Sequence, residues 1–374
     1  MKTFIDYIIK ILIFIIVFLT VLFWASVFYA YLSSDKNDIS LENTVSYVQS
    51  IGNTVVNYKF ADKNSVNLLS NTPVNSTPTL TQTNYGKIKY YYYQLDDNAK
   101  IIYKSLENNI DNLKKDNFTI DFSKTFNDLL HEYTGQEQLN KSFQSALDAF
   151  FYDYPELFYI DLTKISLIIK SSSIGSLTTY TVSISPKDDK NYLYSDFNNE
   201  TDVDVAISKI ENVRTNLINN LSSIGSDYNR ILKLHDNLVN SLEYDSTLNK
   251  ANTHNIYGAL VQNSVVCEGY AKAFKYILDS IDIENILVSG TATNSSGETE
   301  AHMWNYVKIC GNWYGVDITW DDPIIIGGFQ KNNLRHDYFL KGSRTFVKSH
   351  TPSGKISNEG MLFSLPDLCK DNYD

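Results

Sequence analysis

Residues 265–281 read VVCEGYAKAFKYILDSI, and at Cys267 the pattern changes from β-branched residues to that of a helix. From this cysteine, apolar residues recur at i+4, i+7 and i+11, namely Ala271, Phe274 and Leu278. That spacing marks one face of a helix directed towards a protein interior. The thiol is therefore expected at the N-terminal end of a buried helix face.

A helix N-terminus gives Cys267 a setting that favours a negative charge. The first N–H groups of a helix have no partner within it, and the helix dipole is positive at that end. Such ends favour a thiolate and can hold the oxyanion of a tetrahedral intermediate. A lone cysteine is nevertheless more often an inert buried residue, so this position alone does not assign a nucleophile.

The next informative run, residues 302–319, has the composition of a β-hairpin. Two strand-like stretches, HMWNYVKI and NWYGVDIT, are joined by Cys310-Gly311, and an X-Gly junction is typical of a two-residue turn. With these two residues in the turn, Ile309 pairs with Asn312. Cysteine is unfavourable at this turn position, where a positive φ is required.

This register brings a histidine and a carboxylate together. Trp304 then pairs with Asp317, and His302 lies diagonal to Asp317, at roughly 7–8 Å between backbones and within reach of their side chains. A turn one residue later would pair Asp317 with Tyr306 and leave it too far from His302. The three residues then suit acyl transfer: Cys267 attacks, His302 moves the proton, and Asp317 holds the imidazole.

Several ordered blocks of this region resemble the bacterial transglutaminase-like superfamily, whose catalytic Cys, His and Asp occur in this order. The blocks are Tyr257–Leu260, Val266–Phe274, His302–Asn305 and Trp313–Pro323, and they are preceded by His235–Leu238 and Tyr244-Asp245. The similarity covers roughly residues 227–345. Met303 and Cys310 depart from the usual pattern.

The resemblance implies an α+β fold with a papain-like core, in which the Cys267 helix packs on an antiparallel sheet that carries His302 and Asp317. It implies Cys267, His302 and Asp317 as catalytic residues, with no cofactor and no metal. Asp321-Asp322-Pro323 is read as a helix cap or turn rather than a calcium site. Trp304, Trp313, Trp320 and Tyr270 are expected in the core or along an acyl groove, with at least two of them in the core.

The N-terminal sequence predicts a membrane anchor. Residues 11–32 are apolar and uncharged, about the length that crosses a bilayer as a helix. A cleaved signal peptide would have a shorter apolar region. Lys2 and Lys10 place residues 1–10 in the cytoplasm and the rest of the chain outside, as a single-pass protein of the cell membrane.

The remaining chain divides into a spacer and two folded parts. Residues 33–86 are rich in Ser, Thr and Asn, which is typical of a spacer. Residues 87–200 predict a small α+β domain, with helices near 98–113 and 139–151 and extended runs 158–169 and 178–184 joined by a loop at 171–176. Residues 201–374 predict the catalytic domain, beginning with helices 203–224 and 227–242.

The charge and the cysteines exclude other classes. A net charge of −11 argues against a nucleic-acid partner. Three cysteines without a CxxC or Cys/His cluster argue against a disulfide framework and a structural zinc site.

The expected partner is a protein or peptide substrate at the cell surface. Hydrolysis by a peptidase or amidohydrolase is favoured over cross-linking to an amine by a transglutaminase. A non-catalytic surface binding or scaffold protein is the third reading.

Overall fold

The described chain mixes helices with antiparallel sheets. A computed structural model describes residues 53–57, 89–247, 250–322 and 334–373, which belong to one compact unit, Val48–Asp374. Two four-stranded sheets, each paired antiparallel, and a parallel two-stranded ladder confirm the α+β class. The predicted anchor, residues 11–32, and nearly all of the spacer lie outside the described residues. None of the described helices is long and apolar enough to cross a membrane.

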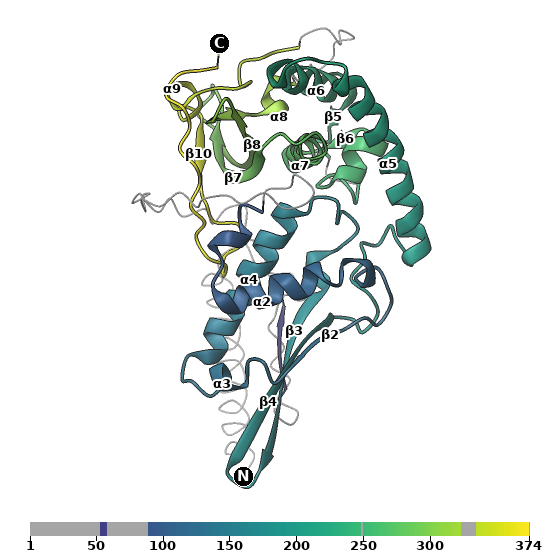
Figure 1. The fold of residues 1–374 in the computed structure, drawn as a ribbon, viewed down its shortest axis with the longest axis vertical. Coiled ribbons are helices and arrows are strands. Elements are labelled where there is room, and N and C mark those ends of the chain that lie inside the picture. The colour runs from purple at the N-terminus through teal and green to yellow at the C-terminus, as the bar shows by residue number, and fades with distance from the viewer. Residues whose placement is uncertain (1–52, 58–88, 248–249, 323–333, 374) are drawn as a thin grey trace, which may run out of the picture. The chain divides into compact units, whose positions relative to one another are not determined.

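Residues 89–199, together with residues 53–57, form a helical layer and a sheet (Figure 1). The helices are α2 (Asp97–Glu107), α3 (Asn127–Leu130) and α4 (Gly135–Asp153), with short 3₁₀ turns η1 (Tyr92–Gln94), η2 (Ile110–Asn112) and η3 (Leu162–Lys164). The strands are β1 (Asn53–Asn57), β2 (Ile120–Ser123), β3 (Ile165–Ile174) and β4 (Leu177–Pro186), in the order β1-β3-β4-β2. α2 and α4 pack together through apolar and aromatic side chains, including an edge-to-face pair of Tyr103 and Phe150.

The β3–β4 hairpin differs from the sequence prediction. The expected loop at 171–176 is mostly strand, because Ile174 pairs directly with Leu177 across a tight turn at Gly175. Polar side chains extend the ladder there, as in the 3.0 Å contact between the Ser173 and Thr178 hydroxyls. Residues 158–164, expected to be extended, precede the strand instead. The hydroxyl-rich composition of residues 171–176 suggests a loop, but Ser and Thr also pair well across exposed strands.

The helices after residue 200 follow their predicted ranges. α5 is Glu200–Ser222 and α6 is Asp227–Ser241, each capped by a polar side chain, Asn199 and Ser226 respectively. The chain then forms β5 (Glu243–Tyr244), a π-helical turn η4 (Gly258–Gln262), β6 (Ser264–Val265) and α7 (Cys267–Asp279). α5 and α6 both contact α7.

The second sheet receives α7 on one face (Figure 1). Its strand order is β10-β7-β8-β9, with β7 (Asn285–Thr293), β8 (Thr299–Ile309), β9 (Asn312–Val316) and β10 (His350–Pro352). Two short helices, α8 (Ile318–Asp321) and α9 (Ser343–Phe346), follow β9. The predicted hairpin register is confirmed, since Ile309 pairs with Asn312 across a turn in which Cys310 and Gly311 both have positive φ.

Side-chain hydrogen bonds join residues 89–199 to the second sheet and its C-terminal extension. The Tyr91 hydroxyl donates to the backbone oxygen of Leu287 on β7. Asp148 of α4 accepts from the Ser357 hydroxyl at 2.7 Å, where the C-terminal segment, yellow in Figure 1, runs down beside α4. The boundaries expected at 86/87 and 200/201 stay predictions.

Candidate active site

Cys267 is the first residue of α7, as the sequence predicts. The preceding residue, Val266, occupies the N-cap position and makes no side-chain cap hydrogen bond. Gly269 N–H and Tyr270 N–H donate to the Val266 backbone oxygen. The backbone N–H groups of Cys267 and Glu268 are therefore the ones that can face an anion. The thiol itself is half-buried.

A glycine and an asparagine fix the start of α7. A Cβ on Gly269 would lie 2.5 Å from Val265 side-chain atoms and 2.8 Å from the Thr253 backbone oxygen. Only glycine therefore lets the first turn approach the Val265 side chain and the Thr253 backbone this closely. One turn further on, Asn305 of β8 donates to the Ala271 backbone oxygen at 3.0 Å. These contacts set the Cys267 helix against the strand that carries His302.

His302 and Asp317 come together as predicted. His302 Nε2 lies 2.7 Å from Asp317 Oδ2, and both side chains are almost fully buried. Asp317 is also the N-cap of α8, where its other oxygen accepts from Trp320 N. With Nε2 bound to the carboxylate, Nδ1 is the nitrogen of His302 that is left for Cys267.

The charges in this group depend on one another. Burial on its own would lower the pKa of His302, but the Asp317 carboxylate and the Cys267 thiolate, each with a hydrogen bond to the ring, raise it well above its usual value. Burial would likewise raise the pKa of Asp317, but His302 and the hydrogen bonds from both histidines hold it well below its usual range. This arrangement favours a charged imidazolium on His302 beside an ionised Asp317.

His350 is a further member of the site that the sequence did not single out. Its Nε2 lies 2.9 Å from the same oxygen of Asp317, and its Nδ1 lies 2.9 Å from the Ser349 hydroxyl. The ring stacks on Phe346 at 4.1 Å between centroids. The sequence carried no usable signal, because β10 reaches the sheet from 33 residues beyond Asp317.

The tryptophans divide between core and site. Trp304, Trp313 and Tyr270 are buried, as expected for core residues. Trp320 is half-buried, and its ring centroid lies 5.5 Å from that of His302. Trp320 is therefore the aromatic residue of this set that can border an acyl group.

Two tyrosines lie close enough to Cys267 for its charge to contribute to a raised pKa of their hydroxyls. Burial, followed by the negative charges of Glu268 and Asp148 and, least, by Cys267, raises the pKa of Tyr152, on α4, above its usual range. Burial and then the negative charge of Cys267 raise the pKa of Tyr244, on β5, to about 12. Both phenols therefore remain hydrogen-bond donors at neutral pH. Three other polar residues that precede α7 are less suitable donors, since Gln262 and Asn263 are exposed and Tyr257 stacks on Phe158.

Two groups of side chains among the described residues have metal-ligand spacing. One is His302, Asp317 and His350, all of them buried. The side chains of this group are at most 3% exposed, so no open face admits an ion. The other group lies elsewhere and includes His235 and His336.

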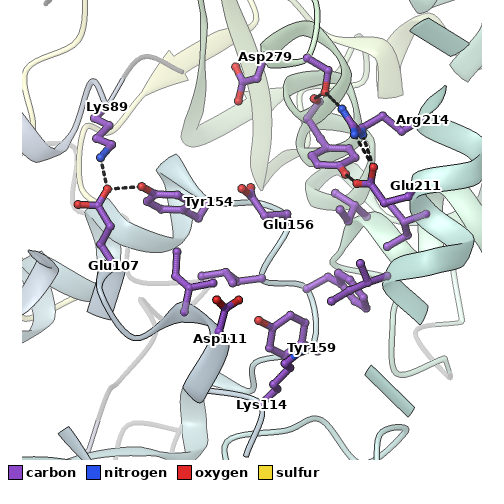
Figure 2. A pocket seen from close by; sticks show the side chains of 18 of the residues that line it. Lys89, Glu107, Asp111, Lys114, Tyr154, Glu156, Tyr159, Glu211, Arg214 and Asp279 are labelled. Carbon is purple, nitrogen blue, oxygen red and sulfur yellow. Dashed lines mark hydrogen bonds and ion pairs between the residues drawn. The ribbon is translucent and has the colours of Figure 1, made fainter. Parts of the chain in front are cut away.

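A cavity of about 850 Å³ lies away from this site (Figure 2). Its wall includes Tyr276 and Asp279 at the C-terminal end of α7, roughly 18 Å along the helix from Cys267. Ion pairs line it, including Lys89 with Glu107 and Arg214 with Glu211. This cavity is therefore not the space around the thiol.

The fold and the site together define an α+β protein in which a half-buried Cys267 at a helix start accompanies a buried His302–Asp317 pair. Residues 215–318 match the family model of the transglutaminase-like superfamily, a range that contains Cys267, His302 and Asp317. This match agrees with the resemblance expected from the sequence, and it identifies residues 215–318 as a transglutaminase-like domain.

Known proteins with similarity to the chain cover parts of it. Kyphoscoliosis peptidase from Mus musculus is 29% identical over 99 residues, which is 24% of this chain but 15% of that relative, and the Homo sapiens protein gives the same values. The crystal structure of a TGase matches with 13% identity over 43% of this chain and 45% of the other, at a TM-score of 0.28. The periplasmic domain of TgpA from Pseudomonas aeruginosa matches with 15% identity, 42% and 72% coverage and a TM-score of 0.23.

Proposed function

We propose that this chain is an extracytoplasmic cysteine peptidase or amidohydrolase that cleaves peptide or isopeptide amides through an acyl-thioester. The observation that carries the proposal is the relay from Asp317 through His302 to Cys267 at the start of α7. The curated relative that aligns over 99 residues is named kyphoscoliosis peptidase. That name supports our choice of hydrolysis over cross-linking for this chain. We assign the core to the papain-like arrangement.

The chemistry uses groups that the site already contains. Cys267 attacks the amide carbon, and the backbone N–H groups of Cys267 and Glu268 at the start of α7 face the developing oxyanion. The hydroxyls of Tyr152 and Tyr244 are further donors near the thiol. His302 gives its proton to the leaving amine, which leaves an acyl-thioester. His302 then takes a proton from water, the hydroxide adds to the thioester, and Cys267 leaves as a thiolate.

The location rests on the sequence alone. The uncharged apolar segment 11–32 and its preceding lysines favour a single-pass anchor in the cell membrane, with the catalytic part outside. The substrate is then a protein or peptide at the cell surface. Protease digestion of intact cells, followed by detection of an epitope placed at the C-terminus, checks this orientation, and a protected epitope would contradict it.

The activity is tested with the full-length chain and with Cys267→Ala. A library of amide-linked peptides is incubated with and without a labelled primary amine, and products are identified by mass spectrometry. Hydrolysis by the unaltered chain is expected, with kcat lower by on the order of 10⁴-fold or more in Cys267→Ala because the nucleophile is lost. Amine incorporation without hydrolysis would instead assign a cross-linking transglutaminase.

The non-catalytic reading is tested by reactivity. A thiol-directed probe at neutral pH should label the unaltered chain at Cys267, and labelling at that peptide should fall strongly in His302→Ala, because the imidazolium no longer stabilises the thiolate. Equal labelling of the two proteins would mean that His302 does not activate the thiol. A binding or scaffold function would then be the better assignment.

A further inference from the structure

A second group of histidines and carboxylates lies where α6 meets the segment after residue 333. His235 Nδ1 lies 3.1 Å from Asp236 Oδ1, and His336 Nε2 lies 2.8 Å from the same oxygen. All three potential ligand atoms lie within 4.8 Å of one another. His235 is fully buried, Asp236 is partly exposed and His336 is 41% exposed. The group thus extends from the interior to solvent.

We propose that His235, Asp236 and His336 bind a divalent transition-metal ion, zinc above others, that clamps α6 to the 334–339 segment. Two imidazoles and a carboxylate are a frequent ligand set for zinc, with water in the fourth position. Calcium and magnesium prefer oxygen ligands alone. The cysteine spacing in the sequence argued against a zinc site, but none of these ligands is a cysteine and His336 is distant in sequence.

The spacing of the ligand atoms fits a tetrahedral ion with modest movement. Bonds of about 2.0–2.1 Å at tetrahedral angles place two ligand atoms roughly 3.3 Å apart. The two measured distances to Asp236 Oδ1 differ from this by about half an ångström or less. The third pair of ligand atoms, His235 Nδ1 and His336 Nε2, must move closer together. His336 can move because its side chain reaches solvent.

A buried carboxylate holds His235 in the orientation that a metal ligand needs. His235 Nε2 lies 3.2 Å from Asp321 Oδ2, and both side chains are completely buried. Asp321 is itself fixed by the Tyr338 backbone N–H, which donates to it at 3.0 Å. In the neutral tautomer that donates Nε2–H to Asp321, the lone pair of the ring lies on Nδ1, towards Asp236, where a metal ion would bind. A carboxylate behind the ligating imidazole is the usual second partner of a zinc-bound histidine.

The site lies next to the catalytic group without overlapping it. Asp321 is the last residue of α8, and its N–H donates to the backbone oxygen of Asp317. The ion would thus fix the far end of the short helix that begins at Asp317. This role does not depend on the proposed activity, and metal binding can be measured without a substrate.

The test titrates Co²⁺ into the full-length chain and follows the visible absorption band of a tetrahedral cobalt site, with Zn²⁺ added afterwards as competitor. Cys267→Ala is used as the parent so that the catalytic thiol cannot bind metal. We expect one ion per chain, displaced by Zn²⁺. Affinity should fall by at least about 100-fold in His336→Ala, since losing a direct ligand exceeds the cost of losing an outer partner.

The matched control is His131→Ala, which removes another exposed histidine far from the cluster and should bind as the parent does. Asp236→Asn provides a second, nearly isosteric ligand variant and should also weaken binding. The proposal is overturned if the parent shows no saturable tetrahedral band, or if His336→Ala and Asp236→Asn bind as tightly as the parent.

Discussion

Asp317 makes more hydrogen bonds in the site than its contact with His302 alone. Its Oδ2 receives two imidazole nitrogens, at 2.7 Å from His302 and 2.9 Å from His350, while Oδ1 caps α8. A buried carboxylate with three hydrogen-bond partners is held in one orientation. That orientation determines which nitrogen of His302 faces the thiol.

Removing the charge of Asp317 should shift the pH dependence of catalysis. The carboxylate raises the pKa of His302, so Asp317→Asn should lower that pKa. If the imidazolium is the active form, the alkaline limb of kcat/KM moves to lower pH, and kcat falls by about 10²–10⁴-fold because the tautomer is no longer fixed. Rate profiles between pH 5 and 10 check this, and an alkaline limb that stays in place would contradict it.

His350 is predicted to act as a positioning residue through Asp317. His350→Leu removes a hydrogen bond to a charged group, worth about 1.5–3 kcal/mol, which corresponds to about 10–100-fold in kcat if it acts in the transition state. His350→Gln keeps an N–H donor and should recover part of the loss. KM should change little in either variant.

A purely structural role for His350 would give a different pattern. Both variants would then lose thermal stability, and kcat in the remaining folded protein would be unchanged. Measuring Tm together with kcat separates the two cases.

At the scale of elements, the β8–β9 hairpin sets the distance between His302 and Asp317. Its type I′-like turn needs positive φ at both residues, and Cys310 has φ of 49°. Asparagine tolerates this conformation far better than cysteine. The hairpin thus holds the catalytic register despite an unfavourable residue at its turn.

Cys310→Asn should stabilise the protein by up to about 1 kcal/mol, because it relieves the backbone cost at the turn. Cys310 is exposed, and its described polar contact is a 3.5 Å approach to the Tyr373 hydroxyl. Urea unfolding of the full chain checks the change. Cys310→Val, with a β-branched side chain, is the control and should destabilise. Equal stability of the two variants would contradict the strain argument.

At the scale of the whole molecule, buried polar contacts join residues 89–199 to the catalytic part. Asp153, at the end of α4, is buried, and burial raises its pKa to about 7 although Lys275 of α7 and the Tyr103 hydroxyl lower it. The folded protein therefore binds this proton more tightly than the unfolded chain. The contribution of protonated Asp153 to the free energy of unfolding is fully present below about pH 4 and is lost as the pH rises through about 7.

Asp153→Asn should flatten this pH dependence, because an amide does not ionise. The unaltered chain should lose on the order of 4 kcal/mol at most from this group between pH 4 and 8, and the variant should lose less. Calorimetric Tm values for both proteins across that range provide the measurement. Parallel curves would mean that Asp153 does not titrate between these pH values.

The sequence by itself determined the local features of the catalytic part. Helical spacing after Cys267 gave the extent of α7, and the X-Gly junction gave the hairpin register, because both depend on neighbours within a few residues. The ordered Cys, His and Asp blocks indicated the family. The same local reasoning failed at residues 171–176, where polar strand residues were read as a loop.

Only the tertiary structure decided which distant residues join the site. His350 reaches Asp317 through β10, and His336 reaches His235 across a separation of about 100 residues, so no local spacing marks either pair. Their positions follow from how β10 and the 334–339 segment pack on elements formed much earlier in the chain. Local chemistry could therefore indicate a nucleophile and its base, but packing determined what holds them.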